Sequence, residues 1–407
     1  MSERRDARYV VLGGGASGSA IVRALAARGV AGPVLLVDDG SVPLDDRVWA
    51  SWRPLSEPED PAVSASWRRL LVATERGERE LALVRHRYVA VRGRDLRAAT
   101  DTALAAIGGA RLTARALAVR EDARGAVVST DVGDVRADLV LDSVGLHPDV
   151  TSAPHAWMSF TGWEVECDHP AFTPDRLRLM DFRVPQDDGV SFVYTLPWSA
   201  TTALVELTGF CAAASPQSTE TSLLAYLDGS LGAGRYAVTR REAATVPLRP
   251  HVHRHSAAHH VALGESAGLV KASSGYGFEL ARRDAAHIAA DLRAGRRPTG
   301  LVRSARHQAM DAVFLDLALR RPATLVAALE QLFARNPADL ALAFLDERTT
   351  LREEVRLVSS LPVRPFVAAA AHAAARSCAC GRACPAVAAS PRRVSGAVAR
   401  SRRHGGG

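Results

Sequence analysis

Apolar and polar positions follow a strand, helix and strand pattern between residues 9 and 38. The apolar run YVVL at Tyr9–Leu12 ends in glycines, and the next run, AIVRALAARG, places apolar residues at helical spacing. A further apolar run, PVLLVDD, ends in an acidic pair. Strand, glycine turn, helix and strand in this order predict the first half of a dinucleotide-binding βαβ unit.

The pattern changes several times along the rest of the chain. Residues 81–97 predict a strand and then a helix that begins at Arg94. The runs TARALAVRED and GAVVSTDVGDVRA predict a hairpin. The run ADLVLDSVG predicts a buried strand that returns to the first sheet. Between Trp157 and Phe210 apolar and polar residues alternate over four runs, which predicts an antiparallel sheet. After Pro298 apolar residues recur at helical spacing, so we expect helices there.

The glycine turn has the spacing that a pyrophosphate needs. Gly13 lets the chain turn, Gly15 lets the backbone approach the ligand, and Gly18 lets the helix pack on the strand, with the helix N-terminus facing the negative charge. Asp38, twenty residues beyond Gly18, is placed to accept both hydroxyls of an adenosine ribose. The acid favours NAD or FAD over a 2′-phosphorylated cofactor.

The net charge of +7 comes from one end of the chain. Residues 376–407 hold seven of the 51 lysines and arginines and none of the 44 acids, so the remainder has 44 residues of each sign. We therefore expect a neutral body with a basic tail, and composition favours disorder of this tail before lipid contact. Nucleic-acid binding is not expected.

The cysteines do not predict a metal site or a disulfide framework. Cys378, Cys380 and Cys384 have His372 nearby, but their C-x-C-x₃-C spacing matches no common zinc pattern. Free thiols fit a reducing compartment. The start MSERRDAR and the lack of a run of about 18 apolar residues predict neither a signal peptide nor a spanning helix, so the expected location is the cytoplasm.

Seven blocks of sequence occur in the order that one family shows. LGGGASG is followed by DDRVWASW, FTGWEVE, LMDFRV and FVYTLPWSATTALVELT, then by GESAGLVKASSGYGF, and finally by a helical part with DAVFLDLALRRP, LFARNP, FLDE and LPVRPF. These blocks resemble the lycopene cyclase family of FAD-dependent carotenoid enzymes, and the bacterial β-cyclases in particular. The resemblance covers most of residues 8–370.

The resemblance implies an α/β fold, namely a Rossmann-like FAD-binding flavoprotein with an antiparallel β-sheet substrate domain and a helical C-terminal part. The predicted boundaries are 1–150 for the first part of the FAD-binding domain, 151–250 for the substrate domain, 251–300 for the return segment of the FAD-binding domain, 301–370 for the C-terminal helices and 371–407 for a disordered basic tail.

The resemblance also implies a reaction without net redox change. Each open ψ end of lycopene is protonated, the neighbouring double bond attacks the cation, and loss of a proton gives a β-ionone ring. FAD is expected in its reduced form, with NADPH or NADH as reductant. Because the substrate, lycopene or a related acyclic carotenoid, comes from a membrane, we expect peripheral contact with lipid, most of all by helices between residues 305 and 345. The oligomeric state stays open.

Cyclisation requires a carboxylic acid that an apolar wall keeps protonated. Glu206, on the apolar strand ALVELT, stands where the family carries its acidic pair and is the first candidate for the proton donor. Leu207 occupies the place of the second acid, and neighbours on a strand point to opposite faces, so Glu206 cannot replace an acid at 207. Asp181 is the other catalytic candidate, and Arg183 on the same strand face favours its ionised form, which suits a base or a structural ion pair better than a proton donor.

The other site residues follow from the matched blocks. We expect FAD to contact Gly13, Gly15, Gly18 and Asp38 at the adenosine end, Gly264, Glu265 and Gly268 near the ribitol and pyrophosphate, and Gly275 and Tyr276 at the isoalloxazine ring. Trp49, Tyr194 and Trp198 are candidates for the wall of the polyene tunnel, although core packing explains each about as well.

Two alternatives share most of these features. A FAD-dependent monooxygenase or reductase of a polyprenyl or carotenoid substrate would have the same glycine motifs and apolar wall, but it would need no acid in the block around Glu206. A cyclase-like protein of weak or lost activity, which binds carotenoid or flavin without catalysis, would tolerate replacement of this acid.

Overall fold

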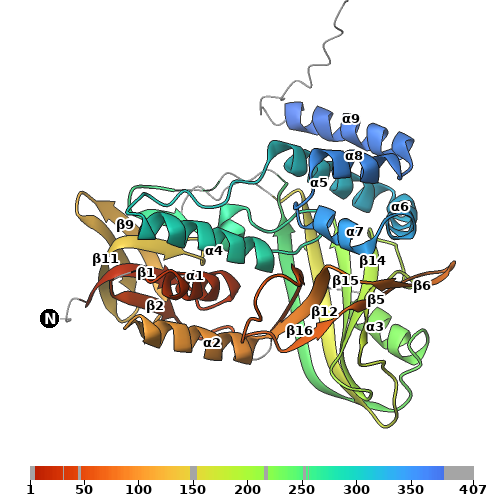
Figure 1. Cartoon of the computed structure of the whole chain (residues 1–407), viewed down its shortest axis with the longest axis horizontal. Helices are drawn as coiled ribbons and strands as arrows, with labels where there is room; N and C mark the ends of the chain where they lie inside the picture. Colours follow the sequence, from red (N-terminus) through yellow and green to blue (C-terminus); the bar gives the residue numbers. More distant parts are fainter. Residues whose placement is uncertain are drawn as a thin grey trace, which may run out of the picture.

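The computed structural model describes residues 5–30, 32–44, 47–146, 154–214, 219–250, 254 and 256–379. Two sheets lie side by side along the long axis of the molecule, and a group of helices covers the second sheet (Figure 1). The predicted tail beyond residue 379, with Cys380 and Cys384, lies outside the described residues.

The first sheet is the nucleotide-binding sheet that the sequence predicted. Its parallel strands are β8 (Ala110–Thr113), β2 (Val34–Asp38), β1 (Arg5–Leu12), β11 (Gly133–Asp142) and β17 (His260–Ala262). The predicted hairpin, β9 (Ala116–Asp122) and β10 (Gly125–Thr130), extends it antiparallel to the first half of β11.

Three helices cover one face of this sheet. They are α1 (Ala16–Ala27), α2 (Gly93–Ala106) and α4 (Phe278–Arg293), with α1 between the other two (Figure 1). Ile21 and Leu25 of α1 are fully buried against Val11 and Leu36 of the strands, while Val10 points to the opposite face. The apolar residues that alternate along the strands and those at helical spacing in α1 therefore pack in one core.

The second sheet has seven strands. Their order is β16 (Tyr236–Leu248), β12 (Ala156–Cys167), β15 (Thr202–Cys211), β14 (Ser191–Pro197), β13 (Arg176–Asp181), β5 (Arg69–Thr74) and β6 (Gly77–Ala82). Neighbouring strands are antiparallel except β13 and β5, which are parallel. The predicted boundary at residue 150 is therefore wrong, because residues 69–82 come from the first segment and complete the second sheet.

A small third sheet connects the two large ones. It consists of β3 (Val48–Pro54), β7 (His86–Arg92) and β4 (Ala65–Trp67). Arg53 of β3 is 1% exposed, and its Nε lies 2.6 Å from Oε1 of Glu279 at the start of α4. This buried ion pair holds the third sheet to the nucleotide-binding domain.

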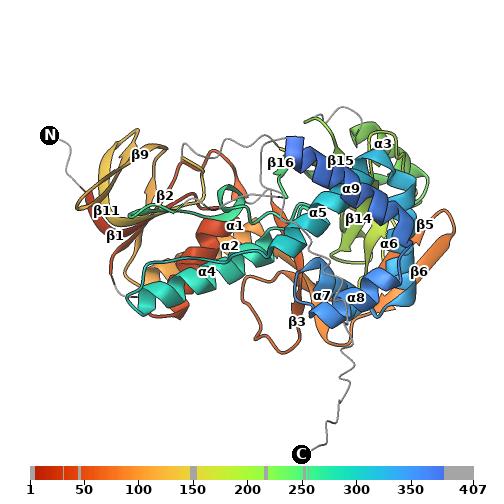
Figure 2. The same cartoon turned by 90° about the horizontal axis from the view of Figure 1, so that it is seen from above.

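Five helices lie over one face of the second sheet (Figures 1 and 2). They are α5 (Ala305–Arg320), α6 (Pro322–Arg335), α7 (Ala338–Leu345), α8 (Leu351–Ser359) and α9 (Val363–Ala379). The short helix α3 (Thr219–Asp228) packs on the other face. The predicted end of the helical part near residue 370 is wrong, because α9 continues through residues 371–379.

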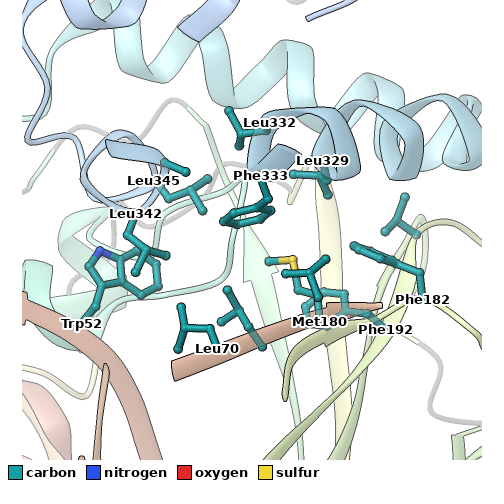
Figure 3. Packing of buried hydrophobic residues seen from close by; sticks show 14 of the residues in the cluster. Trp52, Leu70, Met180, Phe182, Phe192, Leu329, Leu332, Phe333, Leu342 and Leu345 are labelled. Atoms are coloured by element: carbon teal, nitrogen blue, oxygen red, sulfur yellow. The ribbon is translucent and has the colours of Figure 1, made fainter. Parts of the chain in front are cut away.

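The largest core lies between α6, α7 and the second sheet. Phe333 of α6 points toward Met180 of the strands, and Leu342 of α7 lies beside Trp52 (Figure 3). On β15 the even residues, such as Leu204, face this core, while odd residues such as Leu207 face α3. The alternation divides the second sheet into two faces with different surroundings.

Lys271, the single lysine of the chain, fastens the helical part to the nucleotide-binding domain. Its buried Nζ donates to Oδ1 of Asp311 on α5 at 2.7 Å and to Oε1 of Glu347 at 3.1 Å. Arg303 binds the same two carboxylates. Separation of these groups would leave uncompensated charges in the interior, which strongly destabilises the folded state. The network therefore holds the loop before α4 against α5.

Candidate functional site

A cavity of about 330 Å³, here called the acid cavity, lies where the nucleotide-binding domain meets the second sheet. Its wall comes from the N-terminus of α1, strand β3, the loop before α4 and the inner face of β12, β14, β15 and β16. Lining residues include Ala16, Ser17, Trp49, Phe160, Phe192, Tyr194, Glu206, Glu242, Gly264, Glu265, Gly275 and Tyr276.

The glycine turn at the start of α1 leaves open space. Gly13 has a φ of 86°, which side chains rarely allow, and a Cβ on Gly18 would lie 1.8 Å from the Gly13 carbonyl oxygen. A Cβ on Gly15 would meet no atom within 4 Å. Gly13 and Gly18 thus shape the turn, while Gly15 keeps room at a helix N-terminus, as a pyrophosphate requires.

Asp38 stands beside this turn, at the end of β2. Its Oδ2 accepts a hydrogen bond from the backbone N–H of Gly14, and its Oδ1 accepts one from Gly40 at 2.9 Å. The carboxylate therefore lies next to the turn that Gly13 and Gly18 shape, as the ribose role would need.

The late glycine segment closes over the same end of α1. Gly264, at φ 61°, begins a short 3₁₀ turn, η2 (Gly264–Ala267), and a Cβ there would lie 2.2 Å from Oγ of Ser17. Gly268 ends this turn in the left-handed conformation. Gly275 lies directly on β12, since its Cβ would be 2.0 Å from Cε of Met158. These glycines let two distant segments approach closely.

Aromatic side chains form much of the remaining wall. The Tyr276 hydroxyl is hydrogen-bonded to the Tyr88 hydroxyl at 2.8 Å, and its ring stands edge-on to Trp52. Trp49 lines the cavity and stacks on Phe278, with ring centroids 5.9 Å apart. Aromatic faces attract cations, so this wall can stabilise positive charge.

Two carboxyl groups meet above Gly162 in the middle of the second sheet. Gly162 on β12 is paired with Glu206 on β15 and with Glu242 on β16. A Cβ at Gly162 would lie 3.0 Å from Oε2 of Glu206 and 3.1 Å from Cγ of Glu242. The side chains of Glu206 and Glu242, which are 3% and 6% exposed, share the space that this glycine leaves.

The surroundings of these carboxyls favour the protonated form. Burial, and next the charge of Glu242, raise the pKa of Glu206 to about 8, although Tyr194 and Thr208 donate hydrogen bonds to it. Burial also raises the pKa of Glu242, while Arg240, with Nη2 at 3.4 Å from Oε1, opposes the rise. Like charges side by side in an apolar wall are costly, so the surroundings favour a form of the pair that retains one proton.

Leu207 does not remove an acid from the cavity. It points to the far face of the sheet, where it packs with Leu223 and Tyr226 of α3. An acid at 207 would lie in that apolar cluster and not beside Glu206. Glu242 of β16 supplies the second carboxyl instead.

Asp181 and Trp198 do not line the acid cavity. Asp181 is fully buried outside the cavity lining and accepts hydrogen bonds from Arg178, Arg183 and Tyr226. Despite its burial, these bonds hold the pKa of Asp181 below its usual value, as in a structural ion pair. Trp198 lies outside the cavity lining as well, under the Arg92 guanidinium at 4.2 Å.

Sequence reasoning missed Glu242. The strand that carries it lies far along the chain, and its register with Gly162 is a tertiary property. One signal was present: an isolated glycine in the strand FTGWEVE, which is typical of a close approach by another group. Among the described residues no group of three or more acids, histidines or cysteines is placed to hold a metal ion.

Comparison with solved structures shows the fold. The chain is similar to a geranylgeranyl bacteriochlorophyll reductase-like protein from Thermoplasma acidophilum, with a TM-score of 0.59 and 14% identity over 90% of this chain and 99% of that one. It is also similar to p-nitrophenol 4-monooxygenase from Pseudomonas putida, with a TM-score of 0.54 and 14% identity over 89% and 98% of the two chains. These similarities support the Rossmann-like flavoprotein fold.

Sequence comparison is more specific. The lycopene β-cyclase of a Paracoccus species is 28% identical over 356 residues, which cover 82% of this chain and 88% of the relative. The family model described as lycopene cyclase protein matches residues 9–371. Because the match spans both sheets and the helices over them, the chain belongs to the lycopene cyclase protein family.

Proposed function

We propose that this protein cyclises the open ends of lycopene or a related acyclic carotenoid by proton transfer, with FAD bound at the glycine turn. The observation that carries the proposal is the pair of buried carboxyls, Glu206 and Glu242, in a cavity with aromatic walls. A redox enzyme on the same fold would need no such pair. Membership of the family and similarity to a lycopene β-cyclase support the substrate class.

The residues at the glycine turn fit FAD. Gly15 leaves open space at the N-terminus of α1, Asp38 stands beside it for the ribose, and Glu265 lines the cavity where the ribitol would pass. Gly275 and Tyr276 then lie at the isoalloxazine end. When bound in its reduced form, with NADPH or NADH as reductant, FAD supplies negative charge beside a developing cation.

The carboxyl pair can start and finish the reaction. Protonated Glu206 donates to the terminal double bond of the ψ end, and the neighbouring double bond closes the ring on the resulting cation. Glu242, which Arg240 holds nearer to the ionised form, then accepts the proton that leaves the ring. One proton enters and one leaves, so the pair again shares a single proton and no electrons are transferred.

The wall stabilises the intermediate charge and excludes water. Phe160, Phe192 and Tyr194 present aromatic groups around the carboxyls, and Trp49 closes the side toward β3. Because water would trap a carbocation, an apolar enclosure is a requirement of this chemistry.

Contact with a membrane is proposed for α8 and α9. Leu351 and Val355 of α8 and Val363 and Val367 of α9 are 55–64% exposed, and Arg352, Arg356 and Arg364 are exposed on the same helices. Apolar side chains next to arginines suit an anionic lipid surface. Leu315, Leu329 and Leu342 of the region 305–345, where the sequence predicted the contact, lie in the core, so we place the proposed contact on α8 and α9. None of the described helices is long and apolar enough to span a bilayer.

Gly15→Ala is expected to weaken FAD binding while the protein still folds. The φ of −72° at Gly15 suits alanine and its Cβ would meet open space, so only a bound pyrophosphate would be disturbed. We expect a loss of affinity of about tenfold, which corresponds to about 1.4 kcal/mol, in a titration of the apoprotein. An unchanged dissociation constant would place the pyrophosphate elsewhere.

Glu206→Gln is expected to reduce cyclisation by about 100-fold or more, the usual contribution of a general acid. Glu242→Gln should also reduce it, since the second carboxyl accepts the leaving proton. The assay is pigment analysis in a lycopene-accumulating bacterium, followed by rates on purified protein. Glu166→Gln, which replaces an exposed acid on β12, is the matched control and should retain activity.

Unchanged lycopene with soluble, flavin-loaded wild-type protein would refute the proposed function. Loss of activity in Asp181→Asn alone would reverse the assignment of Glu206 as the proton donor.

The cyclisation rate should fall as the pH rises through about 8, where Glu206 loses its proton. In the unfolded chain this carboxyl has its ordinary pKa of 4.5. Between pH 4.5 and about 8 the folded state therefore binds one proton more than the unfolded state, and its stability falls as the pH rises through this range. Glu206→Gln should therefore raise the melting temperature relative to wild type, and more at pH 9 than at pH 5. A flat rate profile from pH 6 to 10 is the contrary result.

Val363→Asp with Val367→Asp is expected to reduce binding to vesicles of anionic phospholipid. Both side chains are exposed, so the fold should persist, while an acid in this surface opposes insertion and repels the lipid charge. Sedimentation should show about a tenfold weaker partition at low salt. Leu117→Asp with Val132→Asp, exposed in the nucleotide-binding domain, is the control pair. An equal loss of vesicle binding in both double variants would argue against α9 as the site of membrane contact.

A further inference from the structure

A second apolar cavity, here called the helix chamber, lies between α5, α6, α8 and α9 and has a volume of about 350 Å³. Its wall includes Phe314, Leu325, Leu329, Leu332, Phe344 and Phe366. Polar side chains in the wall are already bonded, as Lys271 is to Asp311 at 2.7 Å and His307 to Glu354 at 3.0 Å. The chamber therefore suits a hydrocarbon and not a charged ligand.

The helix chamber and the acid cavity lie on either side of a narrow waist. A small cavity of about 20 Å³ between them shares Phe192 and Tyr276 with the acid cavity, and it shares Phe314 and Leu329 with the helix chamber. Leu329 of α6 points from the helices toward Phe192 of the sheet (Figure 3). Leu329 and Phe192 are 7% and 8% exposed, so a thin chain passes the waist only when these buried side chains change rotamer.

The helix chamber opens at the turn between α8 and α9. Val358, Val363 and Val367 line it, and they are also 41%, 55% and 61% exposed. The opening therefore lies within the surface of α8 and α9 that carries exposed apolar side chains and arginines. A hydrocarbon that leaves a lipid surface there would enter the chamber without crossing water.

We propose that the helix chamber holds the distal half of the polyene while the reacting end lies at Glu206 and Glu242. The proposal rests on the proposed function for the identity of the chain, but the chamber itself requires only a long, thin, uncharged isoprenoid. A C₄₀ molecule is too long for the acid cavity alone, and the waist leads into the next apolar space.

This arrangement has a consequence for a substrate with two open ends. After the first ring closes, the molecule must withdraw and return with its other end first, and the helix chamber must then hold the wider cyclised end. The width of the chamber therefore selects between one and two cyclisations. Narrowing it should hinder the second ring more than the first.

Two substitutions narrow the chamber at different depths. Ala328→Phe fills it from α6, where the residue is 2% exposed, and Ala370→Trp obstructs the mouth from an exposed position on α9. Ala368→Trp, exposed on the same helix but outside the chamber wall, is the matched control. Because Ala370 is exposed, its variant should fold even if overpacking destabilises Ala328→Phe.

Binding is measured on flavin-loaded protein with diphenylhexatriene, a linear apolar fluorophore, and products are measured in lycopene-accumulating cells. We expect both narrowed variants to bind the probe about fivefold more weakly than wild type and to raise the ratio of monocyclic to bicyclic product. Ala368→Trp should change neither quantity.

The outcomes separate this proposal from the proposed function. Equal probe binding in wild type, Ala328→Phe and Ala370→Trp would overturn the chamber, even if wild type cyclises lycopene. Weaker probe binding with no cyclisation by wild type would refute the cyclase and retain the hydrocarbon site. If the wild type is a dimer that Ala370→Trp dissociates and Ala368→Trp does not, the mouth of the chamber would be the contact with a second copy of the chain. This result would also overturn the proposal.

Discussion

The burial of two carboxyl groups above one glycine is the constraint on which the candidate site depends. Gly162 has no side chain, so Glu206 and Glu242 can approach from the two neighbouring strands, and the sheet keeps them there by backbone pairing. Two ionised carboxylates would be costly in this apolar wall. The sheet therefore favours retention of one proton at a fixed point, which is the property that the proposed non-redox cyclisation needs.

The alternation of the strands separates the face of the acid cavity from the face that packs on α3. Even residues of β15, among them Glu206, face the acid cavity and the helices, whereas Leu207 and the other odd residues pack against α3. Asp181 lies at the end of β13 among arginines, and its carboxylate is held ionised by them. Burial raises the pKa of Glu206, whereas the arginines hold the pKa of Asp181 below its usual value, so two carboxyl groups of one sheet favour opposite protonation states because their neighbours differ.

The helical part combines a charged anchor with a hydrocarbon interior. Lys271, Arg303, Asp311 and Glu347 hold α5 to the nucleotide-binding domain through buried ion pairs. The rest of the space between α5, α6, α8 and α9 is lined largely by apolar side chains. These ion pairs, together with the bond from Arg283 of α4 to Asp346, fix the helices to the nucleotide-binding domain, and the helix chamber lies between the helices.

The sequence by itself determined the nucleotide-binding half, since the strand, the glycine turn and the helix are local patterns and the order Gly13, Gly15, Gly18 and Asp38 depends on spacing along the chain. It also indicated Glu206, which lies in an apolar strand. Only the tertiary structure decided that Glu242 is its partner, that residues 69–82 complete the second sheet, and that Asp181 lies outside the acid cavity. The physical reason is register: strands far apart in sequence become neighbours through backbone pairing and core packing, which no local pattern encodes.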